Sequence, residues 1–193
     1  MCDKVQDLLF RADFFFESHK QLRTALLKNM PEGAVEKTDY FNSPVAILTI
    51  LNANLYFFEA VSCVASLLRD SQADPTKNEI SFHGLADRLS DMAEGVFQLK
   101  VSTIFAEYKA SGLKEMRDKY VDHKDLKSSG DPTAAFINLP AERLVDSCSR
   151  VIQGLKELYR EHFPDAIANN YFSDFYSPGV HLHVQLLSAR RPT

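Results

Sequence analysis

Residues 43–70, SPVAILTILNANLYFFEAVSCVASLLRD, form the most apolar stretch of the chain and decide its fold class. Ser43 suits the N-cap of a helix, and Pro44 suits the first helical position. The polar residues follow a narrow helical stripe, namely Thr49, Asn52, Tyr56, Glu59 and Ser66. A helix that is apolar nearly all round is usually a central core helix. We therefore expect a buried helix here, in which the carboxylate of Glu59 needs a partner.

The same stretch is long enough to cross a membrane, which is the competing interpretation. Asn52, Asn54 and Glu59 lie in its middle. Polar and ionisable groups are costly in the hydrocarbon of a bilayer. The sequence therefore favours a core helix, and we expect no membrane partner.

Helical periodicity continues on both sides of this stretch. Residues 3–30 predict a long helix that Pro31 and Gly33 end, and residues 31–44 read as a polar connection. The apolar stripe of the predicted helix at 3–30, in steps of three and four, is Val5, Leu8, Ala12, Phe15, His19, Leu22 and Leu26. His19 on such a stripe is usually a core histidine with one satisfied hydrogen bond. Phenylalanine-rich runs at 13–18 and 55–60 are typical of a core or a dimer interface, although stacking surfaces for bases are an alternative.

From Ser81 the helical pattern resumes, with the stripe Phe82, Leu85, Leu89, Met92, Val96 and Leu99. Gly84 and Gly95 weaken it, so either one bent helix or two helices fit. Gly112 marks a C-cap or a bend. After a turn-rich loop, Asn138 is a candidate cap and Pro140 a candidate first residue of the last long helix. The stripe of that helix is Leu144, Cys148, Val151, Leu155, Leu158 and His162.

Composition sets the class of protein. The chain has 193 residues with 45% apolar residues, which fits one domain with a substantial core. Its three cysteines are far apart, which favours reduced thiols, and the charged N-terminus is unlike a secretory signal. We therefore expect a cytoplasmic protein with an all-α, single-domain bundle of about five helices over residues 1–180. Residues 181–193 are expected to be a tail or a short strand.

No motif for a metal or cofactor stands out. His181 and His183 alternate, so they would share one face of a strand, but no third ligand is in view and a solvent-facing pair is favoured. No glycine-rich phosphate loop occurs. The formal net charge of −4 gives no global positive field, so any binding of RNA needs a local basic patch.

The stretch RDKYVDHKD, residues 117–125, carries the candidate chemistry. On a helical wheel with about 100° per residue, Leu113, Met116 and Tyr120 share one face. Arg117 and His123 fall on opposite edges of that face, and Asp118 and Asp122 point outward. A histidine at the end of a helix, beside Asp122 and Asp125, should hold its proton strongly and suits an acid or a phosphate partner.

This stretch resembles the HEPN superfamily (higher eukaryote and prokaryote nucleotide-binding), whose members are helical bundles with an Arg, a polar residue and a His four to six residues further on. The wider phrase is similar to the AbiU-type abortive-infection branch, which reads approximately R-[ND]-K-x-x-A-H-x-D. The agreeing positions are Arg117, Asp118, Lys119, His123 and Asp125. Asp122 stands where that branch usually has Ala. The length of the chain and its expected order of helices are compatible with that branch over nearly the whole chain.

The resemblance implies a metal-independent endoribonuclease or toxin-like defence protein without a cofactor, acting as a homodimer. Arg117, Asp118 and His123 would be catalytic. The cations that would follow the RNA backbone are Lys114, Lys119, Lys124 and Lys127. An antitoxin or another protein would be a further partner.

Two other interpretations stay open. The chain is alternatively a catalytically silent binding or scaffold module of a defence or toxin–antitoxin complex, since Asp122 adds negative charge beside His123. Local physics alone also permits an ordinary charged helix surface, because Lys114 and Asp118 lie four residues apart.

Overall fold

The computed structural model describes residues 2–69, 81–86, 89, 91–120, 139–164 and 184–186, without the side chains of 2, 3, 91, 92, 119 and 120. All regular secondary structure in these residues is helical, so the predicted all-α class is confirmed. The helices are α1 (Cys2–Lys28), α2 (Ala34–Phe41), α3 (Pro44–Leu67), α4 (Phe82–Ala86), α5 (Asp91–Ala110), α6 (Leu113–Tyr120) and α8 (Glu142–His162). Seven labelled helices within the described part exceed the five expected.

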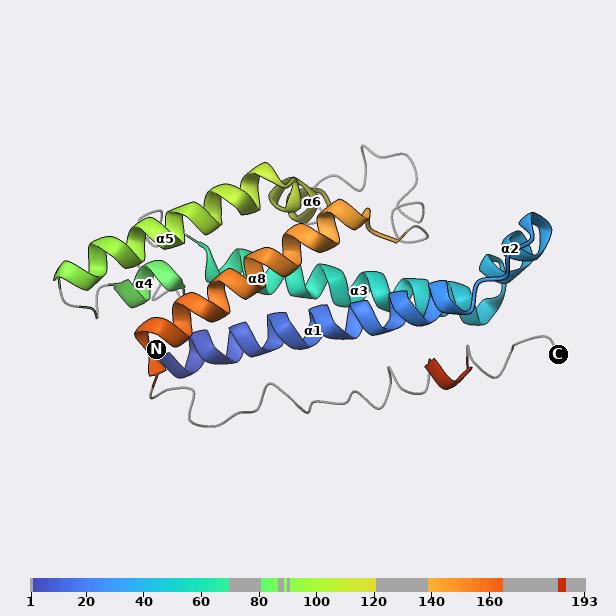
Figure 1. Cartoon of the computed structure of the whole chain (residues 1–193), viewed down its shortest axis with the longest axis horizontal. Coiled ribbons are helices and arrows are strands. Elements are labelled where there is room, and N and C mark those ends of the chain that lie inside the picture. The colour runs from blue at the N-terminus through green and yellow to red at the C-terminus, as the bar shows by residue number, and fades with distance from the viewer. Residues whose placement is uncertain are drawn as a thin grey trace.

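The frame of the molecule is the antiparallel pair α1 and α3 (Figure 1). As expected, α3 begins at Pro44, and the hydroxyl of Ser43 accepts a hydrogen bond from the amide of Ala46 at 3.3 Å. Along the pair, the rings of Phe16 and Phe57 lie 6.5 Å apart. Leu22 and Ala53 share a small buried cluster further along.

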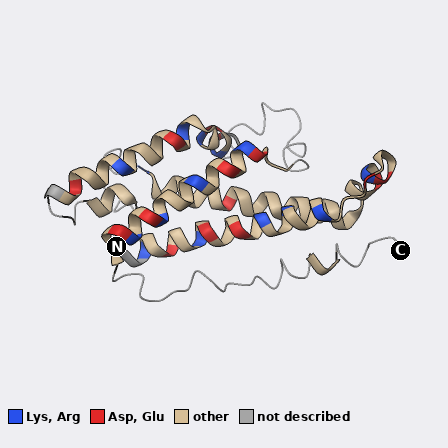
Figure 2. Ribbon diagram, viewed as in Figure 1, with Lys and Arg blue, Asp and Glu red and all other residues tan. Residues whose placement is uncertain are grey.

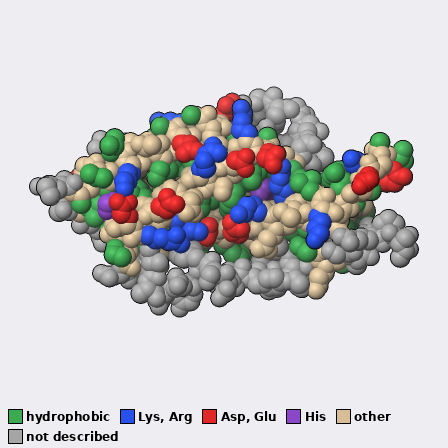
Figure 3. All heavy atoms as spheres, in the orientation of Figure 1, with side chains coloured by type: hydrophobic (Ala, Val, Ile, Leu, Met, Phe, Trp, Pro, Cys, Tyr) green, Lys and Arg blue, Asp and Glu red, His purple; other side chains and the backbone are tan. Residues whose placement is uncertain are grey.

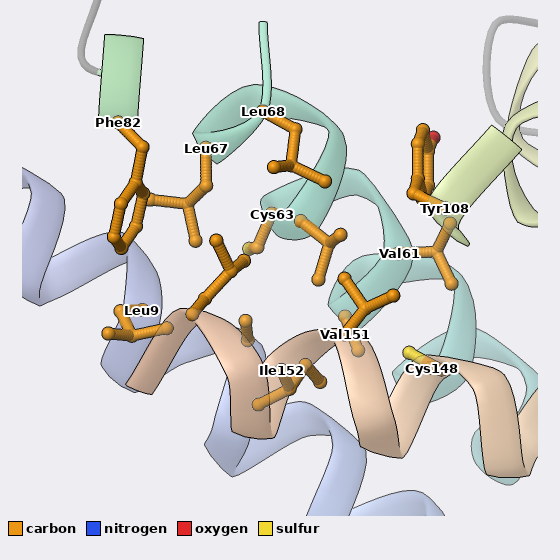
Figure 4. Packing of buried hydrophobic residues seen from close by; sticks show 14 of the residues in the cluster. Leu9, Val61, Cys63, Leu67, Leu68, Phe82, Tyr108, Cys148, Val151 and Ile152 are labelled. Atoms are coloured by element: carbon orange, nitrogen blue, oxygen red, sulfur yellow. The ribbon is translucent and has the colours of Figure 1, made fainter. Parts of the chain in front are cut away.

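The main core lies where α4, α5, α6 and α8 cover one half of this pair. Figure 4 shows side chains of α1, α3 and α8 converging there, among them Leu9, Val61 and Ile152. The predicted stripe of α8 is confirmed at its centre, since Cys148, Val151, Leu155 and Leu158 are buried. Burial of such large apolar side chains is the main force that holds the bundle together.

The expectation of a plain connection at residues 31–44 was wrong, because α2 lies within it. Gly33 is the N-cap of α2, and no residue of α2 is buried. The C-terminal end of α2 is held to α1 instead, where the hydroxyl of Tyr40 donates to the carbonyl of Leu26 at 2.9 Å. A helix attached through one or two side chains leaves no apolar stripe in the sequence, so periodicity missed it.

The stripe predicted from Ser81 onward holds only at its start. Phe82 and Leu85 are buried, but Val96 is 51% exposed and Leu99 is 69% exposed. Phe97 and Val101 are buried in their place. Of the two alternatives, two separate helices form, α4 and α5. Because the helix is interrupted between them, the inward-facing positions of α5 are not a continuation of the stripe of α4.

The central helix α3 is less enclosed than expected. Its large side chains at Ile47, Leu48, Leu51 and Leu55 are exposed. Glu59 is exposed as well, so its carboxylate needs no buried partner, contrary to expectation. Among the described residues, α3 is the one helix with the length and composition to cross a membrane, and half of its most apolar stretch is buried in the bundle.

The start of the last long helix and the expected C-terminal tail both differ from expectation. The last long helix begins at Glu142 with Ala141 as its N-cap, and without a side-chain cap, rather than at Pro140. The proposed cap, Asn138, lies outside the described residues, as do His181 and His183. Of the expected tail or strand, residues 184–186 are described, and they are helical, with Val184 against the α1–α3 pair.

Candidate functional site

The candidate site is on α6, and Gly112 sets the direction of this helix. Gly112 lies between α5 and α6 with φ of +85°, a left-handed conformation that suits glycine, so the predicted C-cap or bend at this position is confirmed. The carbonyl of Gly112 accepts a hydrogen bond from the amide of Met116 at 2.9 Å, which starts the new helix. Figure 1 shows that α6 follows α5 and lies near the start of α8.

The inner face of α6 is fixed to the core. Leu113 is fully buried and Met116 nearly so, and both belong to the main hydrophobic cluster. The helix contacts α3, α5 and α8. The predicted apolar face is therefore confirmed at these two positions, and it places Arg117 and Asp118 on a helix that is packed against the core.

The charged side of α6 carries a short chain of ion pairs. Lys114 Nζ lies 2.6 Å from Asp118 Oδ2, and Arg117 Nη1 lies 3.3 Å from Asp118 Oδ1. The side chain of Arg117 is 25% exposed and that of Asp118 is 40% exposed. Arg117 thus lies nearer the core than Asp118, as the helical wheel predicts. One carboxylate therefore contacts two cations, and it offsets part of their positive charge.

The remaining predicted site residues lie outside the described part of the chain. These are His123, its neighbours Asp122 and Asp125, and the cations Lys124 and Lys127, and the side chain of Lys119 is also outside. The structure therefore brings together Lys114, Arg117 and Asp118, and the catalytic role expected for Arg117 with His123 stays a prediction.

The helices next to α6 carry charges of both signs. Arg150 of α8 lies 2.6 Å from Glu107 of α5, and it also donates to the hydroxyl of Ser147 at 3.0 Å. Basic and acidic residues are mixed along α8 and the first part of α1 in Figure 2, whereas the charged residues of α1 after Glu17 are basic. On the face that Figure 3 shows, blue and red side chains are interspersed in the same way. The face that Figure 3 shows therefore presents no wholly basic surface.

Other reactive side chains sit in the core. Burial raises the pKa of the Cys63 thiol to about 11 and raises the pKa of Cys148 further, so neither is a ready nucleophile. This fits the expected packing role of both cysteines. Within the described ranges, no group of three His, Cys, Asp or Glu residues could hold a metal ion.

A shallow groove between α5 and α8 was not expected from the sequence. Its lining includes Leu99, Ile104, Gly154 and Leu158, with Lys100 and Glu161 at one end. Lys100 Nζ lies 2.6 Å from Glu161 Oε2, so the charges at that end are paired with each other. Gly154 makes room for Ile104, whose side chain would lie 3.4 Å from a Cβ at that position. The one signal in the sequence was a glycine inside the predicted last long helix.

No family model, no curated protein and no solved structure matches the chain. The chemistry of α6 is therefore argued from its own residues. An arginine held on a core-anchored helix beside a carboxylate can bind a phosphate with forked donors. A carboxylate shared between two cations can in turn fix the orientation of that arginine.

Proposed function

We propose that the chain is a metal-independent endoribonuclease of the HEPN type, acting in a defence or toxin-like role at a site shared by two copies. The observation that supports this most is the placement of Arg117. It lies on a helix anchored through Leu113 and Met116, its side chain is 25% exposed, and its guanidinium lies beside the carboxylate of Asp118. Such a donor is suited to the charge that develops on a phosphate in the transition state.

The reaction needs only groups that this chain supplies. The 2′-hydroxyl of RNA attacks the adjacent phosphorus, a new P–O bond forms, and the bond to the 5′-oxygen of the next nucleotide breaks. A base takes the proton of the 2′-hydroxyl, and an acid gives a proton to the leaving 5′-oxygen. His123 is the candidate for proton transfer, and Arg117 is the candidate that stabilises the charged phosphorane.

One chain supplies one Arg117 and one His123, whereas the reaction uses both an acid and a base. A symmetric homodimer would place two copies of the motif at one site, and a closed two-fold dimer is the commonest oligomer. Cations of both copies, Lys114 and Lys119 among them, would then offset the acidic net charge locally.

The second candidate function is a binding or scaffold module of a defence complex that does not cut RNA. A specific observation favours it: Asp118 contacts both Lys114 and Arg117, which reduces the positive charge available to a phosphate. In that case Arg117 would hold a protein or nucleic-acid partner through its exposed edge. The two candidates differ in whether RNA is broken or only bound.

A variant series separates them. Purified protein is incubated with single-stranded and structured RNA in excess chelator, and the products are resolved on a gel. We expect Arg117→Ala to slow cleavage by about 10²–10³-fold, and His123→Ala by about 10²–10⁴-fold. Arg117→Lys keeps the charge but loses the fork, so it should fall between Arg117→Ala and the wild-type protein.

The matched control is Arg150→Ala, which removes another surface arginine that is paired with a carboxylate. It should leave the cleavage rate unchanged. The endoribonuclease proposal fails if Arg117→Ala and His123→Ala both cut RNA as fast as the wild-type protein. Binding of RNA without cleavage by the wild-type protein would favour the binding module.

A further inference from the structure

The start of α8 is tied to α1 by a contact between residues far apart in the sequence. Nη1 of Arg23 donates a hydrogen bond to the carbonyl of Pro140 at 2.8 Å. Pro140 directly precedes Ala141, the N-cap of α8, which has no side-chain cap. Leu139, on the other side of Pro140, packs against the small clusters of the α1–α3 pair. These two contacts fix the point at which the chain enters α8.

The stability of α8 alone does not explain an arginine at this place. The first-turn amides of a helix carry partial positive charge, so an anion is favoured beside them and a cation is not. Glu142 is the acidic residue in the first turn of α8 and suits that end. The partly buried Arg23 donates instead to a carbonyl just outside the helix. It therefore acts on the position of the chain there rather than on the helix dipole.

The start of α8 in turn lies against the turn from which α6 begins. Leu144, in the first turn of α8, packs against the main core, and its Cδ2 would lie 3.9 Å from a Cβ at Gly112. The amide of Leu144 donates to the carbonyl of Ala141 at 2.8 Å, so this side chain moves with the N-cap. Figure 1 shows the two helices side by side at this point, and they are in contact. Because the carbonyl of Gly112 accepts from the amide of Met116, the place of this turn decides where α6 starts.

These contacts form one continuous path from α1 to the candidate site. Arg23 holds Pro140, and the first turn of α8 carries Leu144 onto Gly112. Arg117 lies on the helix that begins there. We propose that Arg23 is a positioning residue for Arg117, which acts by fixing the start of α8 and, through it, the Gly112 turn. Such a residue matters because a misplacement of about 1 Å in a group that acts on the transition state can cost about 10²-fold in rate.

The kinetic part of this inference rests on the proposed function, whereas its structural part does not. The structural part is that Arg23 holds α6 in place, and exchange of backbone amide hydrogens with solvent measures this without RNA. If the wild-type protein leaves RNA intact, the proposed function fails, and the exchange of the α6 amides still decides the role of Arg23.

The exchange experiment compares two substitutions of the same residue. Arg23→Met keeps the apolar stem and removes the donor, so it should speed exchange of the Met116 amide by about two- to tenfold, the change expected when one hydrogen bond is lost. Arg23→Lys can still donate to the carbonyl of Pro140 and should restore the wild-type exchange. The amide of Leu158, in the far half of α8, should exchange at its wild-type rate in both variants.

Cleavage of RNA in excess chelator tests the kinetic part. Arg23→Met should lower kcat by about 10- to 10²-fold with KM unchanged, and Arg23→Lys should recover most of the rate. In an Arg117→Ala background, Arg23→Met should slow cleavage no further, because the group that it positions is already gone. The matched control is Arg11→Met, which removes an exposed arginine of the same helix and should leave kcat unchanged.

Four results would overturn the proposal. The first is an unchanged exchange of the Met116 amide in Arg23→Met. The second is an equal acceleration at Leu158, which would mean that the whole bundle has loosened. In a protein that cuts RNA, the third is a further loss of rate when Arg23→Met is added to Arg117→Ala. The fourth is a failure of Arg23→Lys to recover kcat.

Discussion

The imidazole Nδ1 of His19 lies 2.8 Å from the carbonyl oxygen of Ala53, in the buried contact between α1 and α3. Because a carbonyl only accepts hydrogen bonds, Nδ1 carries the proton of the neutral ring. Nε2 is buried and has no hydrogen-bond partner among the described residues. Burial lowers the pKa of His19 from 6.5 to about 4, an effect that the hydrogen bond to Ala53 opposes and the charge of Arg23 reinforces. The ring is thus neutral in the folded chain at neutral pH.

This arrangement predicts a loss of stability in mild acid. The unfolded chain binds a proton at His19 below pH 6.5, whereas the folded chain resists protonation until about pH 4. Stability from this group is therefore complete above pH 6.5 and is lost as the pH falls towards 4. Between pH 7.5 and pH 5, His19 should contribute a loss of about 2 kcal/mol in the free energy of unfolding.

Urea unfolding at the two pH values measures this loss, with His19→Gln as the control. Glutamine can still donate to the carbonyl of Ala53 but does not titrate. The difference between pH 7.5 and pH 5 should therefore be smaller in His19→Gln by about the same 2 kcal/mol. An equal pH dependence in both proteins would show that the ring is not held neutral.

The ion pair between Lys156 of α8 and Asp13 of α1 should matter for stability. Lys156 Nζ lies 2.8 Å from Asp13 Oδ2, and the two side chains are 17% and 13% exposed. Lys156→Met leaves a mostly buried carboxylate without this cation, which should lower the free energy of unfolding by about 2–4 kcal/mol. Lys100→Met removes the exposed pair with Glu161 and should lower the free energy of unfolding much less, because solvent screens that pair. Denaturant unfolding measures both variants. Equal losses of unfolding free energy in Lys156→Met and Lys100→Met would contradict the claim that burial makes the first pair the stronger one.

The turn before α6 should depend on glycine. Gly112→Ala forces a Cβ into the left-handed region and should lower the free energy of unfolding by about 1–2 kcal/mol. Gly95→Ala is the matched control inside α5, where an added Cβ meets nothing within 4 Å. It should raise the free energy of unfolding by about 0.5–1 kcal/mol. Thermal unfolding of the two variants should therefore shift in opposite directions.

Helical periodicity predicted the fold where one continuous face meets the core. The stripes of α1 and α8, the Ser43 cap and the bend at Gly112 all follow from local rules. The same rule misplaced Val96 and Leu99, because α4 and α5 are separate helices. The residues of α5 that face inward therefore do not continue the stripe of α4. It also missed α2, which is held at its end rather than along a buried face.

The candidate site was predictable only in part. The spacing of Lys114 and Asp118 implies an ion pair, and the structure has that pair. The sequence did not reveal that Asp118 also contacts Arg117, since neighbouring residues on a helix usually diverge. Hydrophobicity alone could not distinguish the buried face of α3 from its exposed leucines, because apolar residues occupy both sides of the helix.

The most direct test of the proposed function uses one end-labelled RNA and the same sequence with 2′-O-methyl groups, both in excess chelator. The proposal predicts that the wild-type protein cuts the unmodified RNA to fragments that end in a 2′,3′-cyclic phosphate. The methylated strand should stay intact because it lacks the attacking hydroxyl. Intact unmodified RNA, cleavage of the methylated strand, or fragments that end in a 3′-hydroxyl would contradict it.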